Sequence, residues 1–440
     1  KEKKTKPTTP VQPRRTGRVR KEAPPMIGLW NPETSEYDLP SMRGFSAYVT
    51  HNIISELTSK STQEAWEDGI LVFDLFTGTG GIVATLQNIL RNMGILASVV
   101  AMCELDVHLR RKLTSNNPTV VMITDACNIN WQEVPTFTIM TSSPPCQDYS
   151  KWGKGEGLKG KNGPTTPAVL DAMEMRSPLA SVTEQVIGFK SLSDTGKWNE
   201  GDRDGPTYTD FKRRGEGLGY DCDEVVINLS EMGLPQNRPR LFVIFTSTTM
   251  NEAIGKFKIE PPPKQEHPMI GPFLRKDPGF YTIMAPITEM APPARVQEYF
   301  QYKPHLRGMY RPINNTTREL GEPHPVWGAQ GLIPCIKTAN RIFVAMDDNI
   351  VEITLEGLAA LQGIPLHELP SNRRQARRAV GNAIHRSMHY WVMAHVVQHV
   401  DRYLRHLKSE AEADDARFLI EQQGEPSKPQ EVKRIEQEVE

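Results

Sequence analysis

In the first half of the chain, short apolar runs alternate with segments whose apolar residues recur at helical spacing. Residues 71–76 form a mainly apolar run of strand length. Apolar side chains then recur at helical spacing over 82–92, and Gly94 is placed to end that helix. Two further apolar runs, 98–102 and 120–123, predict the next strands. This order of strand, helix and strand is typical of a doubly wound α/β fold.

The turn after the first predicted strand reads TGTGG over residues 77–81. Glycines let backbone N–H groups approach a ligand at a helix N-terminus. A dinucleotide site would favour a small residue at position 83, where this chain has Val83, and this disfavours NAD. Glu104 and Asp125 end the next two strands, where they could accept hydrogen bonds from ribose hydroxyls and from the amine of adenine. Each carboxylate alone is more typical of a helix cap or a solvated strand end, but the ordered series indicates an adenosine ligand.

A cysteine lies on a proline-stiffened turn after the apolar run 137–140. The turn reads SSPPCQDYS over residues 142–150, with Cys146 directly after the two prolines. Proline fixes φ and restricts the residue before it, so the backbone that carries the thiol is held in place. Rigid placement favours a nucleophile. The other cysteines are interpreted as small core or surface residues: Cys103, Cys127, Cys222 and Cys335.

Two arginines alternate at the start of another apolar strand. Arg238 and Arg240 precede the run LFVIF over residues 241–245. They could lie on a solvated edge or pair with carboxylates. Because the flanking run predicts a buried strand, and unpaired buried arginines are costly, we expect a ligand or a carboxylate beside them.

Taken in order, these motifs resemble the cytosine-C5 DNA methyltransferases that use S-adenosylmethionine. The resemblance covers residues 71–395. Its matching segments are Phe76–Gly81, Glu104, Asp125, Pro145-Cys146-Gln147, Glu184-Gln185-Val186, Gln236–Arg240, Leu361–Pro365 and a helix start at Gly381–Ile384. One such motif is weak evidence, but the ordered set is specific.

The resemblance implies roles for the residues of the reaction. Cys146 would add to C6 of cytosine, because C5 alone is a poor nucleophile. Glu184, protonated through a raised pKa, would bond N3, and Arg240 would bond O2. Arg238 together with Arg240 would favour the thiolate of Cys146.

The resemblance also implies the binding residues. The expected contacts of S-adenosylmethionine are Phe76, Gly78, Gly80, Gly81, Glu104, Asp125, Pro145 and Asn382. The expected contacts of DNA are Gln147, Ser150 and Gln236. The target would be a duplex whose cytosine is flipped out, because C5 and C6 are hidden within the stack. No metal site is predicted.

One position departs from the family pattern. The family has asparagine in the second position of the Glu-Asn-Val triplet, where it helps to order the nucleophile loop, and this chain has Gln185. The extra methylene is expected to misplace that support. This departure keeps open a silent DNA-binding or cofactor-binding regulator as an alternative to an active enzyme.

The second half of the chain differs in composition from the first. After Phe245 the alternation of strands and helices stops, and Pro, Gly, basic and aromatic residues dominate. By position this stretch resembles the family's target recognition domain. We therefore predict a doubly wound, Rossmann-like methyltransferase domain with a smaller, irregular recognition domain. The predicted segments are a basic disordered tail (1–30), the first part of the catalytic domain (31–245), the recognition domain (246–347), a return segment (348–400) and a charged C-terminal helix or tail (401–440). The return segment is predicted to contain helices at 354–362 and 375–397.

A glycine- and lysine-rich loop over residues 151–180 is predicted to close over the flipped base.

Composition restricts the class of protein. The chain has 440 residues, enough for two or three domains, and a formal net charge of −1. No apolar run approaches the length that crosses a bilayer, and the cysteines are few and odd in number, so we predict an intracellular protein with reduced thiols and no membrane partner. Residues 1–22 carry nine basic and two acidic side chains, which fits a solvated tail, a phosphate-binding arm or a nuclear import signal. We predict a nuclear location from this segment.

The leading hypothesis is therefore a DNA cytosine-C5 methyltransferase. A tRNA cytosine methyltransferase of the same fold is the first alternative, although its Cys-Phe-Thr signature does not occur in this chain. The silent regulator suggested by Gln185 is the second.

Overall fold

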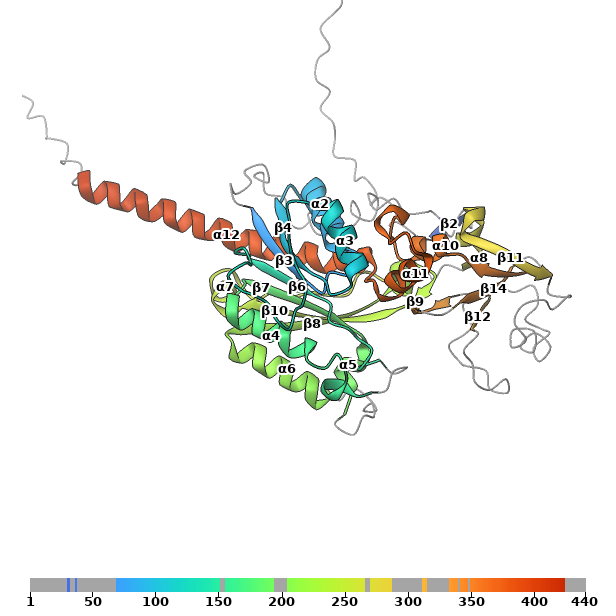
Figure 1. Cartoon of the computed structure of the whole chain (residues 1–440). Helices are drawn as coiled ribbons and strands as arrows, with labels where there is room; N and C mark the ends of the chain where they lie inside the picture. Colours follow the sequence, from blue (N-terminus) through green and yellow to red (C-terminus); the bar gives the residue numbers. More distant parts are fainter. Residues whose placement is uncertain are drawn as a thin grey trace, which may run out of the picture.

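A computed structural model describes the central part of the chain as a mixed α/β protein (Figure 1). The described residues are 30–31, 36–37, 69–150, 155–193, 204–265, 270–286, 311–314, 332–338, 341–346 and 349–423. The predicted tail 1–30, except Trp30, and the last residues, 424–440, lie outside them. Within the described residues, no helix combines the length and apolarity that a membrane crossing requires.

Seven strands form the main sheet, in the order β5-β4-β3-β6-β7-β10-β8. Their bounds are β3 Ile70–Leu75, β4 Ala97–Cys103, β5 Val121–Ile123, β6 Ile139–Ser142, β7 Ala180–Gln185, β8 Tyr220–Asn228 and β10 Pro239–Ser247. The first five strands in spatial order pair in parallel, and β10 inserts antiparallel between β7 and β8. The parallel strands end at one edge of the sheet, which is where ligands bind in such folds.

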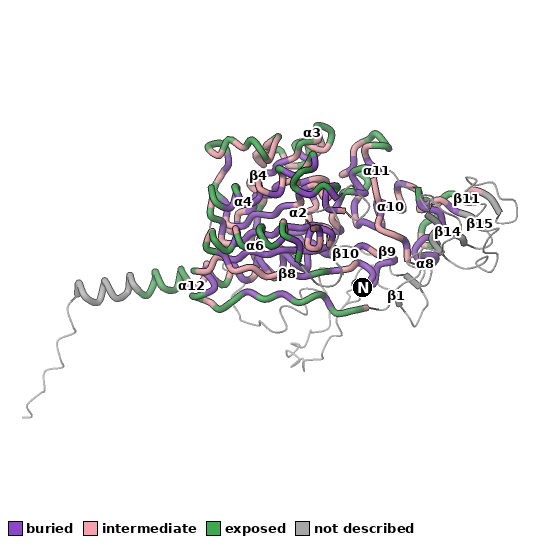
Figure 2. The backbone as a smooth tube through the Cα atoms, turned by 90° about the horizontal axis from the view of Figure 1, so that it is seen from below, coloured by how far each residue is buried: buried purple, intermediate pink, exposed green. Residues whose placement is uncertain are grey.

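Helices cover both faces of this sheet. On one face α2 (Gly81–Met93), α7 (Thr248–Ile254) and α12 (Arg386–Gln423) share a core with the strands. On the other face the core includes residues of α4 (Thr165–Arg176), α5 (Ile187–Ser191) and α6 (Pro206–Gly217). Helix α3 (Val107–Asn116) follows β4. The buried residues lie mainly in these layers, whereas the later part of α12 extends beyond them and is exposed (Figure 2).

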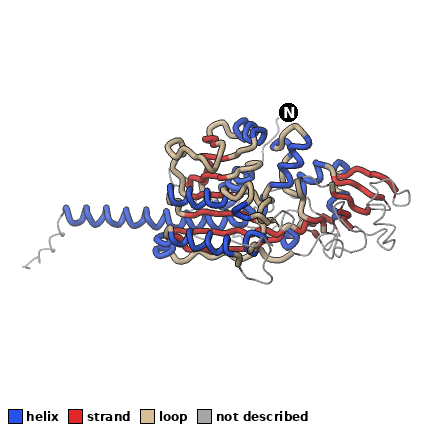
Figure 3. Tube along the Cα trace, turned by 60° about the horizontal axis from the view of Figure 1, so that its bottom comes forward, coloured by secondary structure: helices blue, strands red, loops and turns tan. Residues whose placement is uncertain are grey.

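A second, smaller sheet lies beside the first unit, in the order β11-β15-β14-β12 (Figure 3). Its strands are β11 Tyr281–Pro286, β12 Arg311–Asn314, β14 Ile342–Met346 and β15 Asn349–Ile353, all paired antiparallel. Helices α8 (Ile270–Arg275), α10 (Leu355–Leu361) and α11 (Arg373–Asn382) contribute to its core. The stretch predicted to be irregular therefore contains a sheet, and the predicted boundary after residue 347 falls inside the β14–β15 hairpin.

Short elements complete the described chain. Strands β1 (Trp30–Asn31) and β2 (Glu36–Tyr37) pair with each other, and β13 (Ile333–Pro334) pairs in parallel with β9 (Gln236–Asn237). The 3-10 helices are η1 Gly157–Lys159, η2 Leu229–Met232, η3 Pro278–Phe280 and η5 Leu366–Glu368. The β13–β9 pair joins the second unit to the sheet that carries the arginine motif.

The structure confirms several predicted elements and corrects others. Helix α2 ends at Gly94, whose φ of +69° suits glycine, and α10 begins after the cap residue Thr354. Residues Gly381–Ile384 do not start a helix, because α11 ends at Asn382 and α12 begins at Arg386. The predicted lid over residues 151–180 is not a loop throughout, because the segment from Thr165 is helix α4. Residues 151–154 of the lid lie outside the described part.

The packing of α6 on β10 generates a test of the fold. A Cβ at Gly215 would lie 2.3 Å from a ring carbon of Phe245 in β10. We expect Gly215→Ala to lower the free energy of unfolding by about 1–3 kcal/mol, because the buried ring must move. Gly217→Ala in the same helix meets no atom within 4 Å and should stabilise by about 0.5–1 kcal/mol. Urea unfolding of both variants checks the pair, and equal effects would contradict the packing.

Candidate cofactor and nucleophile site

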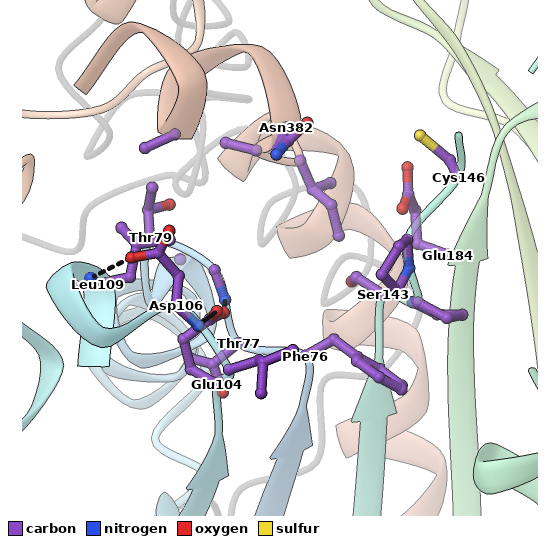
Figure 4. A pocket seen from close by; sticks show the side chains of 18 of the residues that line it. Phe76, Thr77, Thr79, Glu104, Asp106, Leu109, Ser143, Cys146, Glu184 and Asn382 are labelled. Carbon is purple, nitrogen blue, oxygen red and sulfur yellow. Dashed lines mark hydrogen bonds between the residues drawn. The ribbon is translucent and has the colours of Figure 1, made fainter. Parts of the chain in front are cut away.

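A cavity of about 640 Å³ opens at the carboxyl edge of the main sheet (Figure 4). Residues from the glycine turn, the acidic strand ends, the proline-cysteine turn and the α11–α12 link line it. The predicted cofactor residues in this lining are Phe76, Gly78, Gly81, Glu104, Asp125, Pro145 and Asn382, and Cys146, Glu184, Arg240 and Gln147 line it too. Segments that are far apart in the sequence therefore meet in one cavity.

The glycine turn holds an unusual backbone. Phe76, Gly78 and Gly80 have φ of 63°, 60° and 78°, and the turn leads directly into the N-terminus of α2. A Cβ at Gly80 would lie 2.7 Å from a methyl carbon of Leu113 in α3, so glycine is needed there for space as well as conformation. Gly81 has no such conflict, since a Cβ would meet only Arg386 at 3.9 Å.

Glu104 joins the turn to the end of β4. Its Oε2 accepts a hydrogen bond from the backbone N–H of Gly78 at 2.7 Å, and its Oε1 accepts one from Asp106 at 2.7 Å. Burial raises the pKa of this carboxyl. The backbone bonds fix both oxygens at the cavity wall, where each can still accept a hydroxyl hydrogen.

These residues fit S-adenosylmethionine. Glu104 offers acceptors for a ribose diol, and the side chain of Leu105 beside it is 69 % exposed and lines the cavity, offering an apolar face for a base. Asp125 also lines the cavity, where its oxygens accept from the backbone of Cys127 and the side chain of Asn128. Leu105 was not predicted as a cofactor contact, although a large apolar residue directly after the acidic end of a strand could have indicated one.

Cys146 and Glu184 lie side by side across the cavity from Glu104 (Figure 4). Cys146 follows β6, and its carbonyl accepts hydrogen bonds from the backbone of Tyr149 and Ser150, which closes the turn. Burial raises the pKa of the Cys146 thiol, and the Arg240 guanidinium opposes that shift. Arg238 opposes it as well, so two cations favour the thiolate, although the net shift of the pKa is upward.

Arg240 and Glu184 form a buried ion pair. The Nε of Arg240 lies 2.8 Å from Oε1 of Glu184, and the two side chains are 8 % and 11 % exposed. Burial raises the pKa of Glu184 although Arg240 opposes it. Of the two partners proposed for the arginines, a ligand or a carboxylate, Arg240 therefore has a carboxylate.

Arg238 has a different environment from Arg240. It precedes β10 and is 1 % exposed, and its Nη atoms donate to four protein acceptors. These are Cys335 Sγ (3.0 Å), Ile336 O (3.2 Å), Gly381 O (3.3 Å) and Ala383 O (2.6 Å). All four Nη hydrogens are thus engaged, whereas the buried Nε–H has no partner among the described residues. Arg238 is not part of the cavity lining, and its bonds tie separate segments together.

Gln185 supports the nucleophile turn in spite of its extra methylene. Its Nε2 donates to the carbonyl of Pro144 at 2.8 Å, and its Oε1 accepts from the backbone of Val186 at 2.9 Å. The expected misplacement is therefore wrong, because the longer side chain reaches the turn directly.

The residues predicted to contact DNA differ in their solvent exposure. Gln147 is exposed at the cavity, and Ser150 is partly exposed. Gln236 is 0 % exposed, donates to the carbonyl of Leu361 and accepts from the backbone of Ile336. Its burial removes Gln236 from the candidate DNA contacts.

The support of the turn by Gln185 predicts a specific loss of stability. Gln185→Glu has the same shape but replaces the donor to Pro144 by an acceptor, at a side chain that is 1 % exposed. We expect it to lower the free energy of unfolding by about 1–3 kcal/mol. The same change at exposed Gln147 should stay within about 0.5 kcal/mol of the wild type. Urea unfolding compares the two, and similar losses would refute a role for the Gln185 donor.

Buried Asp74 predicts a pH dependence of stability. Asp74 lines the cavity, accepts from Thr141 Oγ1 at 2.5 Å and has its pKa raised to about 7 by burial. The unfolded chain releases this proton near pH 4, so between about pH 4 and 7 the folded state binds more protons and loses stability as pH rises. Relative to Asp74→Asn, the wild type should lose up to about 4 kcal/mol across this window. Urea unfolding as a function of pH measures the difference, and parallel curves would contradict the raised pKa.

Comparisons with known proteins agree with this geometry. Residues 70–396 match the family model described as C-5 cytosine-specific DNA methylase. The type II methyltransferase M.NgoBV of Neisseria gonorrhoeae is 27 % identical over 195 residues, which are 44 % of this chain and 45 % of that protein. M.NmeDI of Neisseria meningitidis serogroup C is 33 % identical over 114 residues, 26 % of this chain and 25 % of that protein.

A solved structure shows the same fold. The Dnmt2 methyltransferase of S. pombe superposes with a TM-score of 0.52 at 13 % identity, over 75 % of this chain and 98 % of that one. The matches to the two curated relatives span less than half of their length. The family model covers most of the chain, and the chain therefore belongs to the C-5 cytosine-specific DNA methylases.

Proposed function

We propose that this protein transfers a methyl group from S-adenosylmethionine to C5 of a cytosine flipped out of duplex DNA. The observation that carries the proposal is the meeting of Cys146, Glu184 and Arg240 in the same cavity as Glu104 and the glycine turn. A nucleophile and two groups for ring charge thus lie beside a cradle for an adenosine ligand. The family model is described as a C-5 cytosine-specific DNA methylase, which supports DNA as the partner.

The cavity residues divide the chemistry among them. Glu104, the glycine turn and Asn382 would hold S-adenosylmethionine, which would supply an electrophilic methyl group. The Cys146 thiolate adds to C6 of the cytosine, and the electron pair moves toward N3 and O2 while C5 becomes nucleophilic. After methylation, loss of the C5 proton returns the electron pair, breaks the bond to C6 and releases the thiolate.

Glu184 and Arg240 would stabilise the charge that forms on the ring. Oε2 of Glu184 has no partner among the described residues, so it can carry a proton to N3, and burial favours the protonated form by raising the pKa. Within the described part of the chain, the Arg240 guanidinium has three acceptors: Glu184, Pro239 O and Cys335 Sγ. Two of its five N–H groups are left for O2.

The second unit would read the DNA. Its sheet lies beside the main unit, to which β13 and β9 join it, and this suits a surface that holds the opened duplex. We propose target recognition for residues between α7 and α10 and a covering role for the segment with Lys161 and Asn162, which line the cavity. A nuclear location remains a prediction, since the basic segment lies outside the described residues and both relatives reported above are bacterial.

Transfer of label tests the proposal. With labelled S-adenosylmethionine, the wild type should label duplex DNA, and Cys146→Ser should fall below about one thousandth of that rate. Cys127→Ser, at an exposed thiol, is the matched control and should retain activity. A duplex with 5-fluorocytosine should also trap a covalent adduct at Cys146, because no C5 proton can leave.

The other outcomes separate the alternatives. Label on tRNA but not on DNA would favour a tRNA methyltransferase. No label on either, with S-adenosylmethionine still bound, would favour a silent regulator. Activity retained in Cys146→Ser would overturn the assignment of the nucleophile.

A further inference from the structure

Cys335 lies against both arginines of the catalytic strand. It follows β13, whose pairing with β9 brings residues 332–338 across the start of β10. Its Sγ is 3.0 Å from Nη1 of Arg238 and 3.6 Å from Nη2 of Arg240. One sulfur thus contacts two guanidinium groups, in a segment that the proposed chemistry has not used.

The buried charges require a second anion. Arg238 and Arg240 are 1 % and 7 % exposed, so two cations lie in the interior. Among the described residues, Glu184 is the carboxylate that pairs with them, through Arg240. A buried cation without a counter-charge is strongly destabilising, and Arg238 otherwise has neutral carbonyl acceptors. A thiolate at Cys335 would balance the pair.

The electrostatic surroundings favour that thiolate. Both guanidiniums lower the pKa of Cys335 by more than burial raises it, and the net shift is downward. The other charged or titratable groups near this cluster are Cys146 and Glu184 beyond Arg240, Lys337 on the same segment, and His385 and Arg386 at the start of α12. His385 stays neutral, since burial and the arginines lower its pKa to about 3. The sulfur also lies 3.7 Å from the carbonyl oxygen of Ile336, to which the thiol form would donate, whereas the thiolate would accept only from the arginines.

We infer that Cys335 is an anionic positioning residue that orients Arg238 and Arg240, and so aims the free donors of Arg240 at the cytosine. This inference rests on the proposed function. Glu184 holds Nε of Arg240 and Cys335 holds Nη2, so the plane of the guanidinium is fixed from two sides. Arg238, held by the same sulfur, fixes the start of β10.

This arrangement gives two effects of opposite sign. Burial is the main cause of the raised pKa of Cys146, and a negative charge on Cys335 adds to it and so works against ionisation of the nucleophile. Its removal should make Cys146 easier to ionise while methyl transfer becomes slower, because Arg240 loses its orientation. A side chain that only filled space would not lower the pKa of Cys146 when replaced.

Alkylation of Cys146 measures the first effect without DNA or cofactor. The full chain is treated with iodoacetamide across a pH series, and the peptide that contains Cys146 is quantified by mass spectrometry. In Cys335→Ser the midpoint should move to lower pH by on the order of 0.5–1 unit. Cys335→Asp, which keeps a negative charge, should keep the wild-type midpoint, and Cys222→Ser, at a thiol away from the arginines, should not change it.

Single-turnover methyl transfer measures the second effect. Cys335→Ser should be about tenfold slower than the wild type at unchanged S-adenosylmethionine affinity, and Cys335→Asp should recover most of the rate. An unchanged Cys146 midpoint in Cys335→Ser would overturn the inference. If Cys335→Ser fails to unfold cooperatively, Cys335→Asp decides, since a folded aspartate variant with a shifted midpoint contradicts a charge role. A wild type that labels no nucleic acid would instead count against the proposed function, because the alkylation shift does not depend on it.

Discussion

The buried pair of Glu184 and Arg240 is the interaction on which the rest of the site depends. It exists because β10 inserts antiparallel beside β7, with Phe242 opposite Glu184. Arg240, two residues before Phe242, therefore meets the carboxylate at 2.8 Å. In a low-dielectric interior neither charge is tolerated alone. The place of β10 in the sheet therefore brings Arg240 to the cavity and determines the electrostatic surroundings of Cys146.

Local features of the site were predictable from the sequence. The glycine turn and the strand ends at Glu104 and Asp125 depend on residues close together in the chain, where periodicity and turn chemistry apply. The family and the doubly wound fold were identified correctly from the order of motifs. The lining of the cavity by Cys146, Glu184 and Arg240 was also anticipated, although their separate roles remain proposals.

Other features could not be predicted because their partners are distant or belong to the main chain. Three of the four acceptors of Arg238 are backbone carbonyls, which carry no residue signature. Cys335 meets Arg240 across 95 positions, and a single cysteine gives no indication of that contact. Gln185 was misjudged because the reach of a side chain depends on a backbone separation that only coordinates give. The second sheet was missed because long connections separate β11, β12 and β14 in the sequence, although β14 and β15 form a hairpin.

The acceptors of Arg238 also constrain how the chain can be made. Its guanidinium is buried against Cys335, Ile336, Gly381 and Ala383, all of which follow it by about a hundred residues or more. During synthesis the strand that carries Arg238 leaves the ribosome long before these acceptors do. Burial of its charge must wait for them, since unsatisfied buried cations are costly. All seven strands of the main sheet lie within residues 70–247, but the interior around Arg238 is complete only when the last third of the described chain has been added.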